Sequence, residues 1–165
     1  MKTALIRVDS SFIIGSGHLY RCLNLAIFLR KNKFKVIFIC RKLKNNFNSI
    51  ITKNKFRVIY LPAPKKNNKI NTSNYKSWLE VPYINEIEDS ERVISGFKNI
   101  EFLIVDHYSI DSLWHNKIKK YANKLVIIDD LFNRKLSCDF LINHNFNIKY
   151  QYKNIVNKEA ELLLG

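Results

Sequence analysis

Six short apolar segments recur along the chain and predict β-strands. They cover residues 3–8, 35–40, 57–61, 102–105, 125–128 and 140–142. Each segment is apolar at consecutive positions, a pattern typical of strands that are buried on both faces of a sheet. Strands of this kind occur in parallel sheets covered by helices on each side, so this pattern restricts the chain to the α/β class.

Helical patterns lie between the predicted strands. Residues 19–31 place apolar side chains at helical spacing, and residues 47–53, 85–97 and 111–123 predict further helices, the last with Asp111 as its N-cap. The polar stretch 65–76 predicts a loop, and Pro62 ends the strand before it. The alternation predicts a Rossmann-like α/β fold, a parallel sheet with helices on both faces, forming a single domain over residues 1–165.

Length and composition exclude several classes of protein. The 165 residues contain 47% apolar and 25% charged residues, a globular composition that can bury a real core. No apolar run approaches the roughly 20 residues that span a bilayer. The apolar stretch at the start of the sequence is too short for a signal peptide. The three cysteines are far apart in the sequence, which disfavours a disulfide framework and leads us to expect a cytoplasmic protein.

The charge is divided unevenly along the chain. Residues 1–79 hold 17 basic residues and one acidic residue, whereas residues 80–165 hold 11 basic and 13 acidic residues. Such a basic half would attract polyanions, membrane surfaces or phosphorylated substrates. However, lysine outnumbers arginine 21 to 7, and no zinc-finger spacing or RNP-like motif is present. We therefore expect neither nucleic acid nor a membrane as a partner, and we interpret most of the lysines as a solvated face.

Polar and ionisable residues follow the predicted strands. Ligands of open parallel sheets bind beyond the carboxyl ends of the strands, which makes these residues the candidates for a site. They are Asp9, Ser10, Ser11 and Gly15–His18 after the first strand, Asp106, His107 and Tyr108 after the fourth, Asp129 and Asp130 after the fifth, and Asn143, His144 and Asn145 after the last. The alternative is that Asp and Asn only cap the following helices, which remains open for Asp106 and Asp129.

The turn Gly15-Ser16-Gly17-His18 is the most distinctive local motif. A glycine-rich turn from a strand into a helix directs backbone N–H groups and the helix dipole at an anion. A dinucleotide fingerprint requires a third glycine where this chain has Tyr20, and an acidic residue about 20 positions later, but none occurs before Glu80. We therefore expect no dinucleotide and no other cofactor.

His18 opens the helix after this turn. The positive end of the helix dipole disfavours an imidazolium, so we expect a neutral ring that can act as a general base on water or a substrate hydroxyl. The alternative is a histidine that only packs or caps. Cys22 lies one helical turn later and is a candidate for a thiol or metal pair, but a small core residue is expected there, and no second pair has metal-ligand spacing. We expect no metal.

Several further motifs occur in a fixed order. They comprise Arg7–Ser11, Ile14–His18 with Arg21-Cys22-Leu23, residues 36–41, Trp78–Pro82 with Glu88-Asp89, Val105–Tyr108 with Asp111 and Trp114, Ile128–Leu131 with Arg134, Cys138-Asp139, and Asn143-x-Asn145. Together they resemble the N-terminal half of the UDP-2,4-diacetamido-2,4,6-trideoxy-β-L-altropyranose hydrolase family of pseudaminic acid biosynthesis. That family, often labelled spore-coat polysaccharide biosynthesis, has a GT-B fold related to glycosyltransferases of the peptidoglycan type. His144 departs from the family pattern, where a glutamine or similar residue is expected.

The resemblance implies hydrolysis of a UDP-sugar at the anomeric carbon, with inversion and release of UDP. It implies His18 as the base that activates water, Tyr108 as a substrate contact, and Asp9, Asp106 and Asp129 as residues that shape the sugar pocket. The full candidate set for substrate binding is Asp9, Ser10, Gly15, Ser16, Gly17, Arg21, Asp106, His107, Tyr108, Asp129, Asp130, Asn143 and Asn145.

The resemblance also implies that the C-terminal half of a GT-B enzyme, which binds the nucleotide, is absent. Residues 161–165 resemble the stretch that leads into that half. We therefore expect a domain that is inactive alone and that has a separately encoded C-terminal half as a possible partner. Two alternatives remain: a GT-B glycosyltransferase domain of surface polysaccharide biosynthesis, and a non-catalytic binding module that uses the basic N-terminal half.

Overall fold

A computed structural model of the chain describes residues 2–65, 71, 74–146 and 149–165. Within these residues, seven strands form one sheet in the order β3-β2-β1-β4-β5-β6-β7, and every neighbouring pair is parallel. The strands are β1 (Thr3–Val8), β2 (Lys35–Arg41), β3 (Arg57–Leu61), β4 (Ile100–Asp106), β5 (Ala122–Ile128), β6 (Phe140–Asn143) and β7 (Glu161–Leu164). This arrangement confirms the predicted Rossmann-like α/β fold.

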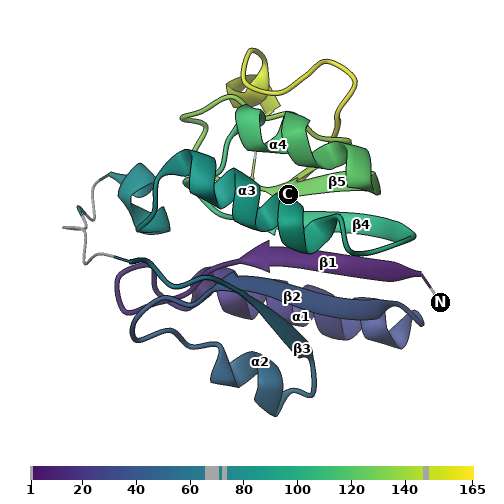
Figure 1. Cartoon of the computed structure of the whole chain (residues 1–165). Helices are drawn as coiled ribbons and strands as arrows, with labels where there is room; N and C mark the ends of the chain where they lie inside the picture. The colour runs from purple at the N-terminus through teal and green to yellow at the C-terminus, as the bar shows by residue number, and fades with distance from the viewer. Residues whose placement is uncertain (1, 66–70, 72–73, 147–148) are drawn as a thin grey trace.

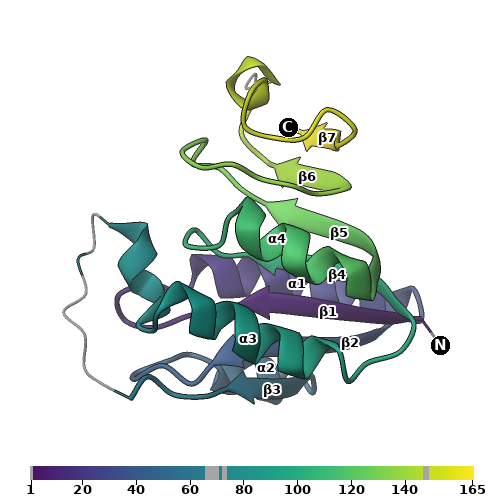
Figure 2. The ribbon, with the colours of Figure 1, turned by 45° about the horizontal axis from the view of Figure 1, so that its top comes forward.

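Helices cover both faces of the sheet. The α-helices are α1 (Gly17–Lys31), α2 (Ser49–Lys53), α3 (Tyr83–Ile94) and α4 (Ser112–Ile118), and the 3₁₀ helices are η1 (Tyr75–Leu79), η2 (Lys119–Tyr121) and η3 (Lys149–Tyr152). Figure 1 shows the strands in one layer, and Figure 2 shows α3 and α4 in front of the sheet with α1 behind it. Among the described residues, no helix has the length and hydropathy needed to cross a bilayer.

The alternation of side chains along the strands divides the core into two layers. Leu5, Ile37 and Val105 face α3 and α4, where they pack with Ile94 and Trp114. The neighbouring positions face α1 and α2 and form the second layer, which includes Ala4, Ile6, Phe38, Ile104, Ile128, Leu19, Leu23, Ala26 and Ile51. Consecutive strand residues therefore enter different layers, which explains why the strands are apolar throughout.

Most predicted elements are present, and the differences have local causes. The predicted helix 111–123 ends at Ile118, because Ala122 already pairs with Ile100 of β4 and the chain turns through η2 in between. Part of the predicted loop 65–76 lies outside the described residues, and its end, Tyr75-Lys76, belongs to η1. The η1 helix forms because Trp78 and Leu79 are buried.

β7 was not among the predicted strands. Its four residues pair in parallel with β6, from Phe140 opposite Glu161 to Asn143 opposite Leu164. Leu162 and Leu164 pack against the core layer under α4, whereas Glu161 and Leu163 are exposed. A strand of only four residues with alternating exposure gives a weak signal in the sequence, so the backbone pairing with β6 defines it.

The order in which the strands are added reverses after β3, so that β1 and β4 become neighbours. The chain first builds β2 and β3 on one side of β1 and then crosses to β4 on the other side. The loops that follow β1 and β4 therefore separate from each other and leave a crevice at the carboxyl edge of the sheet. His18 follows the first of these strands and Asp106 ends the second.

Candidate functional site

A cavity of about 760 Å³ opens at the carboxyl edge of the sheet, on the side of α1. Its wall comes from the start of α1, from η1, and from the ends of β4, β5 and β6. The lining residues are Ile14, Gly17, His18, Arg21, Leu25, Trp78, Tyr108, Ile128, Asp130, Ile142 and His144. The cavity therefore lies where ligands of open parallel sheets bind.

The turn before α1 has a fixed backbone geometry. Gly15 has φ = 81°, which side-chain-bearing residues rarely adopt, and its N–H donates to the carbonyl of Ser11 at 2.8 Å. Ser16 occupies the N-cap position but makes no side-chain cap bond, and no acidic residue lies in the first turn of the helix. The turn delivers Gly17 and His18 to the cavity wall with the positive end of the helix dipole unopposed by a carboxylate of that turn.

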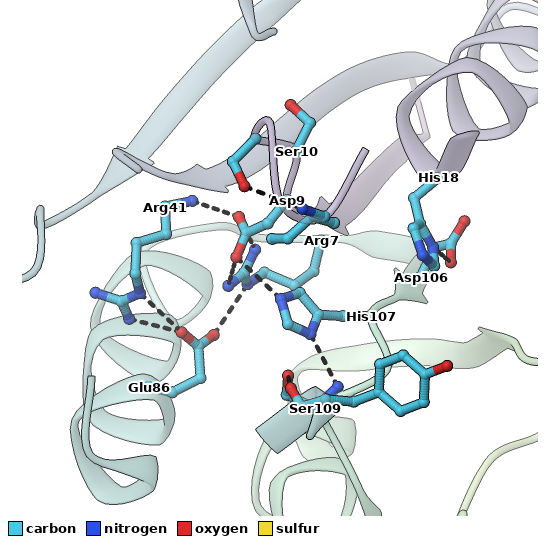
Figure 3. A network of polar contacts seen from close by, with 12 residues as sticks. Arg7, Asp9, Ser10, His18, Arg41, Glu86, Asp106, His107 and Ser109 are labelled. Atoms are coloured by element: carbon cyan, nitrogen blue, oxygen red, sulfur yellow. Dashed lines mark hydrogen bonds and ion pairs between the residues drawn. The ribbon is translucent and has the colours of Figure 1, made fainter. Parts of the chain in front are cut away.

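His18 has one ring nitrogen in a hydrogen bond and one without a partner. The residue is 7% exposed, and its Nδ1 lies 2.6 Å from Oδ1 of Asp106 (Figure 3). Within the described part of the chain, no hydrogen bond reaches Nε2, although the ring forms part of the cavity wall. A neutral imidazole whose Nδ1 donates to a carboxylate carries its lone pair on Nε2.

Asp106 is completely buried as a side chain but ionised. Arg21 donates to both of its oxygens, from Nε at 2.5 Å and from Nη2 at 2.6 Å. Burial by itself would raise the pKa of Asp106, but the hydrogen bonds from Arg21 and His18 outweigh it and lower the pKa below its usual value. The sulfur of Cys22 also approaches Oδ2 at 3.5 Å.

Arg21 also connects this group to Asp130 and Tyr108. Its Nη1 donates to Asp130 Oδ2 at 3.0 Å, and the Tyr108 hydroxyl donates to Asp130 Oδ1. Burial, followed by the bond to Asp130, raises the pKa of Tyr108 above its ordinary value, so the side chain remains a neutral phenol. The Tyr108 ring meets the His18 ring edge-on, with 4.3 Å between the centroids and an angle of 78°. Five residues thus form a closed ring of contacts around the base of the cavity.

Aromatic side chains of η1 close one side of the cavity. Trp78 lies edge-on to Tyr75 with 4.8 Å between the ring centroids, and it lies 5.8 Å from the ring of Tyr108 and 6.4 Å from that of His18. Its indole Nε1 is buried, and none of the described residues forms a hydrogen bond with it. Sequence reasoning did not assign Trp78 to the site, because helical or strand periodicity does not place a residue that follows a long polar stretch.

The residues at the strand ends divide between the two faces of the sheet. Asp106, Tyr108, Asp130 and His144 continue the strand positions that face α1, and Tyr108, Asp130 and His144 line the cavity with Asp106 behind His18. The alternate residues face α3 and α4 and make structural contacts; they are Asp9, His107, Asp129 and Asn143. Only half of the polar side chains at this edge can therefore reach one ligand.

Asp9 belongs to a buried cluster of charges beside the cavity, shown in Figure 3. It accepts from Arg7 at 2.5 and 2.8 Å and from the backbone N–H of Arg41 at 2.6 Å. Glu86 accepts from Arg7 at 2.9 Å and from Arg41 at 2.6 Å. We call Arg7, Asp9, Arg41, Glu86 and His107 the charge cluster. Burial opposes ionisation of Asp9, but Arg7 and His107 together hold its pKa well below the usual range.

His107 is a structural member of this cluster. Its Nε2 lies 3.1 Å from Asp9, and its Nδ1 accepts from the backbone N–H of Ser109 at 3.1 Å. Because Nδ1 accepts, Nε2 carries the proton and donates to Asp9. Burial lowers the pKa of His107, and the charge of Asp9 compensates only in part. Both ring nitrogens are occupied, so His107 has none free for a ligand.

The remaining candidates are placed as follows. Asp129 accepts from Arg134 at 2.6 Å and from two backbone N–H groups at 3.3 Å. Asn143 donates to the Tyr152 hydroxyl at 2.8 Å and accepts from the backbone N–H of Asn145. Ser10 donates to Asn48 at 3.3 Å. These residues, with Gly15 and Ser16, do not line the cavity.

The cysteines are all free and buried. Burial, reinforced by the charge of Asp106, raises the pKa of the Cys22 thiol, and burial raises the pKa of Cys138 to about 12. A protonated thiol is a poor nucleophile and a poor metal ligand, so these side chains act as core residues. In the described ranges, no group of three or more His, Cys, Asp or Glu side chains has the geometry of a metal site.

Comparison with known proteins gives no functional information beyond the geometry of the cavity. No protein-family model matches the sequence, and no curated protein matches it significantly. Among solved structures, the chain is similar to MurG from Acinetobacter baumannii, with 10% sequence identity. The match covers 100% of this chain and 67% of that chain, with a TM-score of 0.40. A superposition this loose carries no argument about function, which must rest on the cavity and its residues.

Proposed function

We propose that this domain binds a UDP-linked sugar and that His18 is the general base that activates a nucleophile at the anomeric carbon. One observation carries the proposal. His18 is more than nine-tenths buried in the wall of a large cavity, at the crevice between β1 and β4. Its Nδ1 is bonded to a carboxylate, and no described residue bonds to its Nε2. A general base requires such an available lone pair within reach of the substrate.

We propose water as the nucleophile. The water oxygen attacks the anomeric carbon while its proton passes to Nε2 of His18. The bond between that carbon and the phosphate oxygen breaks, and UDP leaves with the electron pair. Because attack and departure occur on opposite faces of the sugar, the configuration inverts. The phenol of Tyr108, whose ring touches His18, would contact the sugar beside the base.

The composition of the cavity wall supports a sugar that carries methyl groups. Ile14, Leu25, Trp78, Ile128 and Ile142 provide apolar surface, and the polar groups are confined to a few positions. A diacetamido-trideoxy hexose presents two acetyl methyl groups and a C6 methyl group, which such a wall would shield from water. A fully hydroxylated hexose would leave more polar groups unpaired against the same surface.

We propose that this chain binds the sugar and supplies the base, and that a second lobe of the GT-B type binds the uridine. The first turn of α1 contributes N–H groups and a dipole that would favour a phosphate at the cavity mouth. Residues 1–79 hold 17 basic residues and one acidic residue, and this excess would add long-range attraction for a diphosphate.

Binding can be tested on the chain as it is. The UDP-linked diacetamido-trideoxy sugar, titrated into ¹⁵N-labelled protein, should shift the backbone amide signals of Gly17, His18, Arg21 and Tyr108, and UDP-glucose should shift them less. An absence of shifts at these positions at millimolar ligand would contradict the proposal.

Turnover distinguishes hydrolysis from sugar transfer. In ¹⁸O-labelled water, hydrolysis places ¹⁸O on the anomeric carbon of the free sugar, whereas a glycosyltransferase, the alternative function, gives an unlabelled glycoside and requires an acceptor alcohol. With the second GT-B lobe supplied, either joined to this chain or added as a partner, we expect His18→Gln to abolish UDP release. We expect Tyr20→Phe, on the exposed side of the same helix, to preserve it. Full release by His18→Gln would eliminate His18 as the base.

The alternative of a basic binding module is tested separately. It predicts retention on heparin at physiological salt, with a steep loss of binding as salt rises. We expect early elution, because the lysine-rich composition is typical of a solvated face. Strong retention on heparin, together with no amide shifts at the cavity residues in the titration, would favour the binding module.

A further inference from the structure

The environment of His18 determines which of its two neutral tautomers is present. Two groups lie near Nδ1: the Asp106 carboxylate at 2.6 Å, which can only accept, and Arg21 Nη2 at 3.2 Å, which can only donate. Nδ1 can therefore either donate to Asp106 or accept from Arg21, and the two arrangements put the imidazole proton on opposite nitrogens.

The distances favour donation to Asp106. If Nδ1 carried a lone pair, it would face the lone pairs of an ionised carboxylate oxygen at 2.6 Å, which is repulsive. Arg21 Nη2 already donates to the same Asp106 oxygen at 2.6 Å, a much shorter contact than its 3.2 Å approach to His18. These distances place a proton on Nδ1, and in the neutral ring the lone pair then lies on Nε2 at the cavity.

We infer that Asp106, held in place by Arg21, is a positioning residue that fixes the tautomer and the ring orientation of His18. Arg21 engages both oxygens of Asp106 and is itself tied to Asp130, which holds Tyr108. The Tyr108 ring in turn packs edge-on against the His18 ring, with 4.3 Å between the centroids. The catalytic role of this tautomer rests on the proposed function, but the tautomer itself is a property of the free protein.

His107 provides an internal contrast within the same fold. Its Nδ1 accepts from the Ser109 backbone and its Nε2 donates to Asp9. The two histidines are therefore expected in opposite tautomers, although each is paired with a buried aspartate. Multiple-bond ¹H–¹⁵N spectra of the labelled chain distinguish a protonated from an unprotonated ring nitrogen, and His18→Gln identifies the signals of His18.

The experiment compares the wild-type chain with Asp106→Ala near neutral pH. In the wild type we expect His18 protonated at Nδ1 alone and His107 at Nε2 alone. In Asp106→Ala, Arg21 Nη2 is the hydrogen-bonding group left beside Nδ1 among the described residues, so the His18 proton should move to Nε2. The matched control is Asp129→Ala, which removes a buried aspartate paired with Arg134 at the end of the next strand and should leave the His18 signals unchanged.

Several results would overturn the inference: Nε2 protonation or a mixture of tautomers in the wild type, or an unchanged His18 signal in Asp106→Ala. If Asp106→Ala does not fold, the reciprocal variant decides. His18→Ala should shift the carboxyl ¹³C signal of Asp106 and leave that of Asp129 in place, and an unshifted Asp106 signal would refute the pairing. None of these spectra requires turnover, so a chain that hydrolyses no nucleotide sugar can still confirm or refute the tautomer.

Discussion

Arg7 and Glu86 are 79 positions apart in the sequence, yet their side chains are joined at 2.9 Å with no exposure of either. This pair connects β1 to α3, and Arg41 extends it to β2 through the other oxygen of Glu86. Glu86 therefore bridges two buried guanidinium groups on adjacent strands, while Asp9 is the second carboxylate on Arg7 and Asp89 the second on Arg41. The charge cluster is thus a set of compensating charges beside the apolar core.

The first prediction concerns the carboxylate charge of Glu86. Glu86→Gln leaves Arg7 and Arg41 insufficiently compensated in a dry environment, and we expect it to lower the free energy of unfolding by about 3 kcal/mol or more. Urea denaturation measures the change. The control is Glu88→Gln, the same substitution at an exposed position of α3, for which we expect a change within about 0.5 kcal/mol. Equal effects of the two variants would contradict a structural role for the charge cluster.

The second prediction concerns pH. Burial, aided by the charge of Arg134, lowers the pKa of His115 to about 3, whereas in the unfolded chain it titrates near its ordinary value of 6.5. Between these values the unfolded state binds the extra proton, so stability is full above pH 6.5 and decreases as the pH falls. We expect His115→Gln to reduce this slope by up to about 1.4 kcal/mol per pH unit between pH 6 and 4. Denaturant titrations at several pH values measure it, and an unchanged slope would show that His115 is protonated in the folded state.

The third prediction concerns the turn before α1. Gly15→Ala forces a Cβ into a left-handed backbone conformation, which costs about 1–2 kcal/mol although nothing lies within 4 Å of the new atom. Gly17→Ala is the control, because its backbone is ordinary and the space around it is equally open. Thermal unfolding should show a lower midpoint for Gly15→Ala only. Equal midpoints would mean that the turn relaxes to accommodate alanine.

The fourth prediction concerns local opening. β7 is a four-residue edge strand with alternating exposure, whereas Ala4, Leu5 and Ile6 of β1 are completely buried in the centre of the sheet. We expect the amides of β7 to exchange with solvent at least ~100-fold faster than those of β1, because an edge element opens without unfolding the core. Hydrogen exchange followed by NMR measures both sets. Equal protection would show that β7 opens only with the whole domain.

Apolar runs predicted the sheet because the strands in its middle are buried on both faces. The bounds of β1 and β3 match the prediction, since an aspartate follows one run and a proline the other. β7 could not be predicted from four residues of alternating exposure, and η1 depends on the burial of Trp78, which a local pattern does not reveal.

The sequence placed the candidate residues at the edge of the sheet where the cavity lies, but it did not resolve the two sides of that edge. Residues that follow one another at a strand end point in opposite directions, so Asp130 reaches the cavity and Asp129 does not. Applying the two-residue period of the strands beyond their ends would have separated them. The Arg7–Glu86 pair lay beyond sequence reasoning, since an arginine within a strand gives no sign of its distant partner.

The burial of the three thiols makes the chain a reporter of its own opening. Cys22, Cys40 and Cys138 lie in α1, in β2 and in the segment before β6, and each is protected from reagents in the folded state. A thiol-reactive dye can therefore label each cysteine only when its surroundings open. The three labelling rates, separated by peptide mass, would show whether the helix of the site, the centre of the sheet and its far edge open together or one after another.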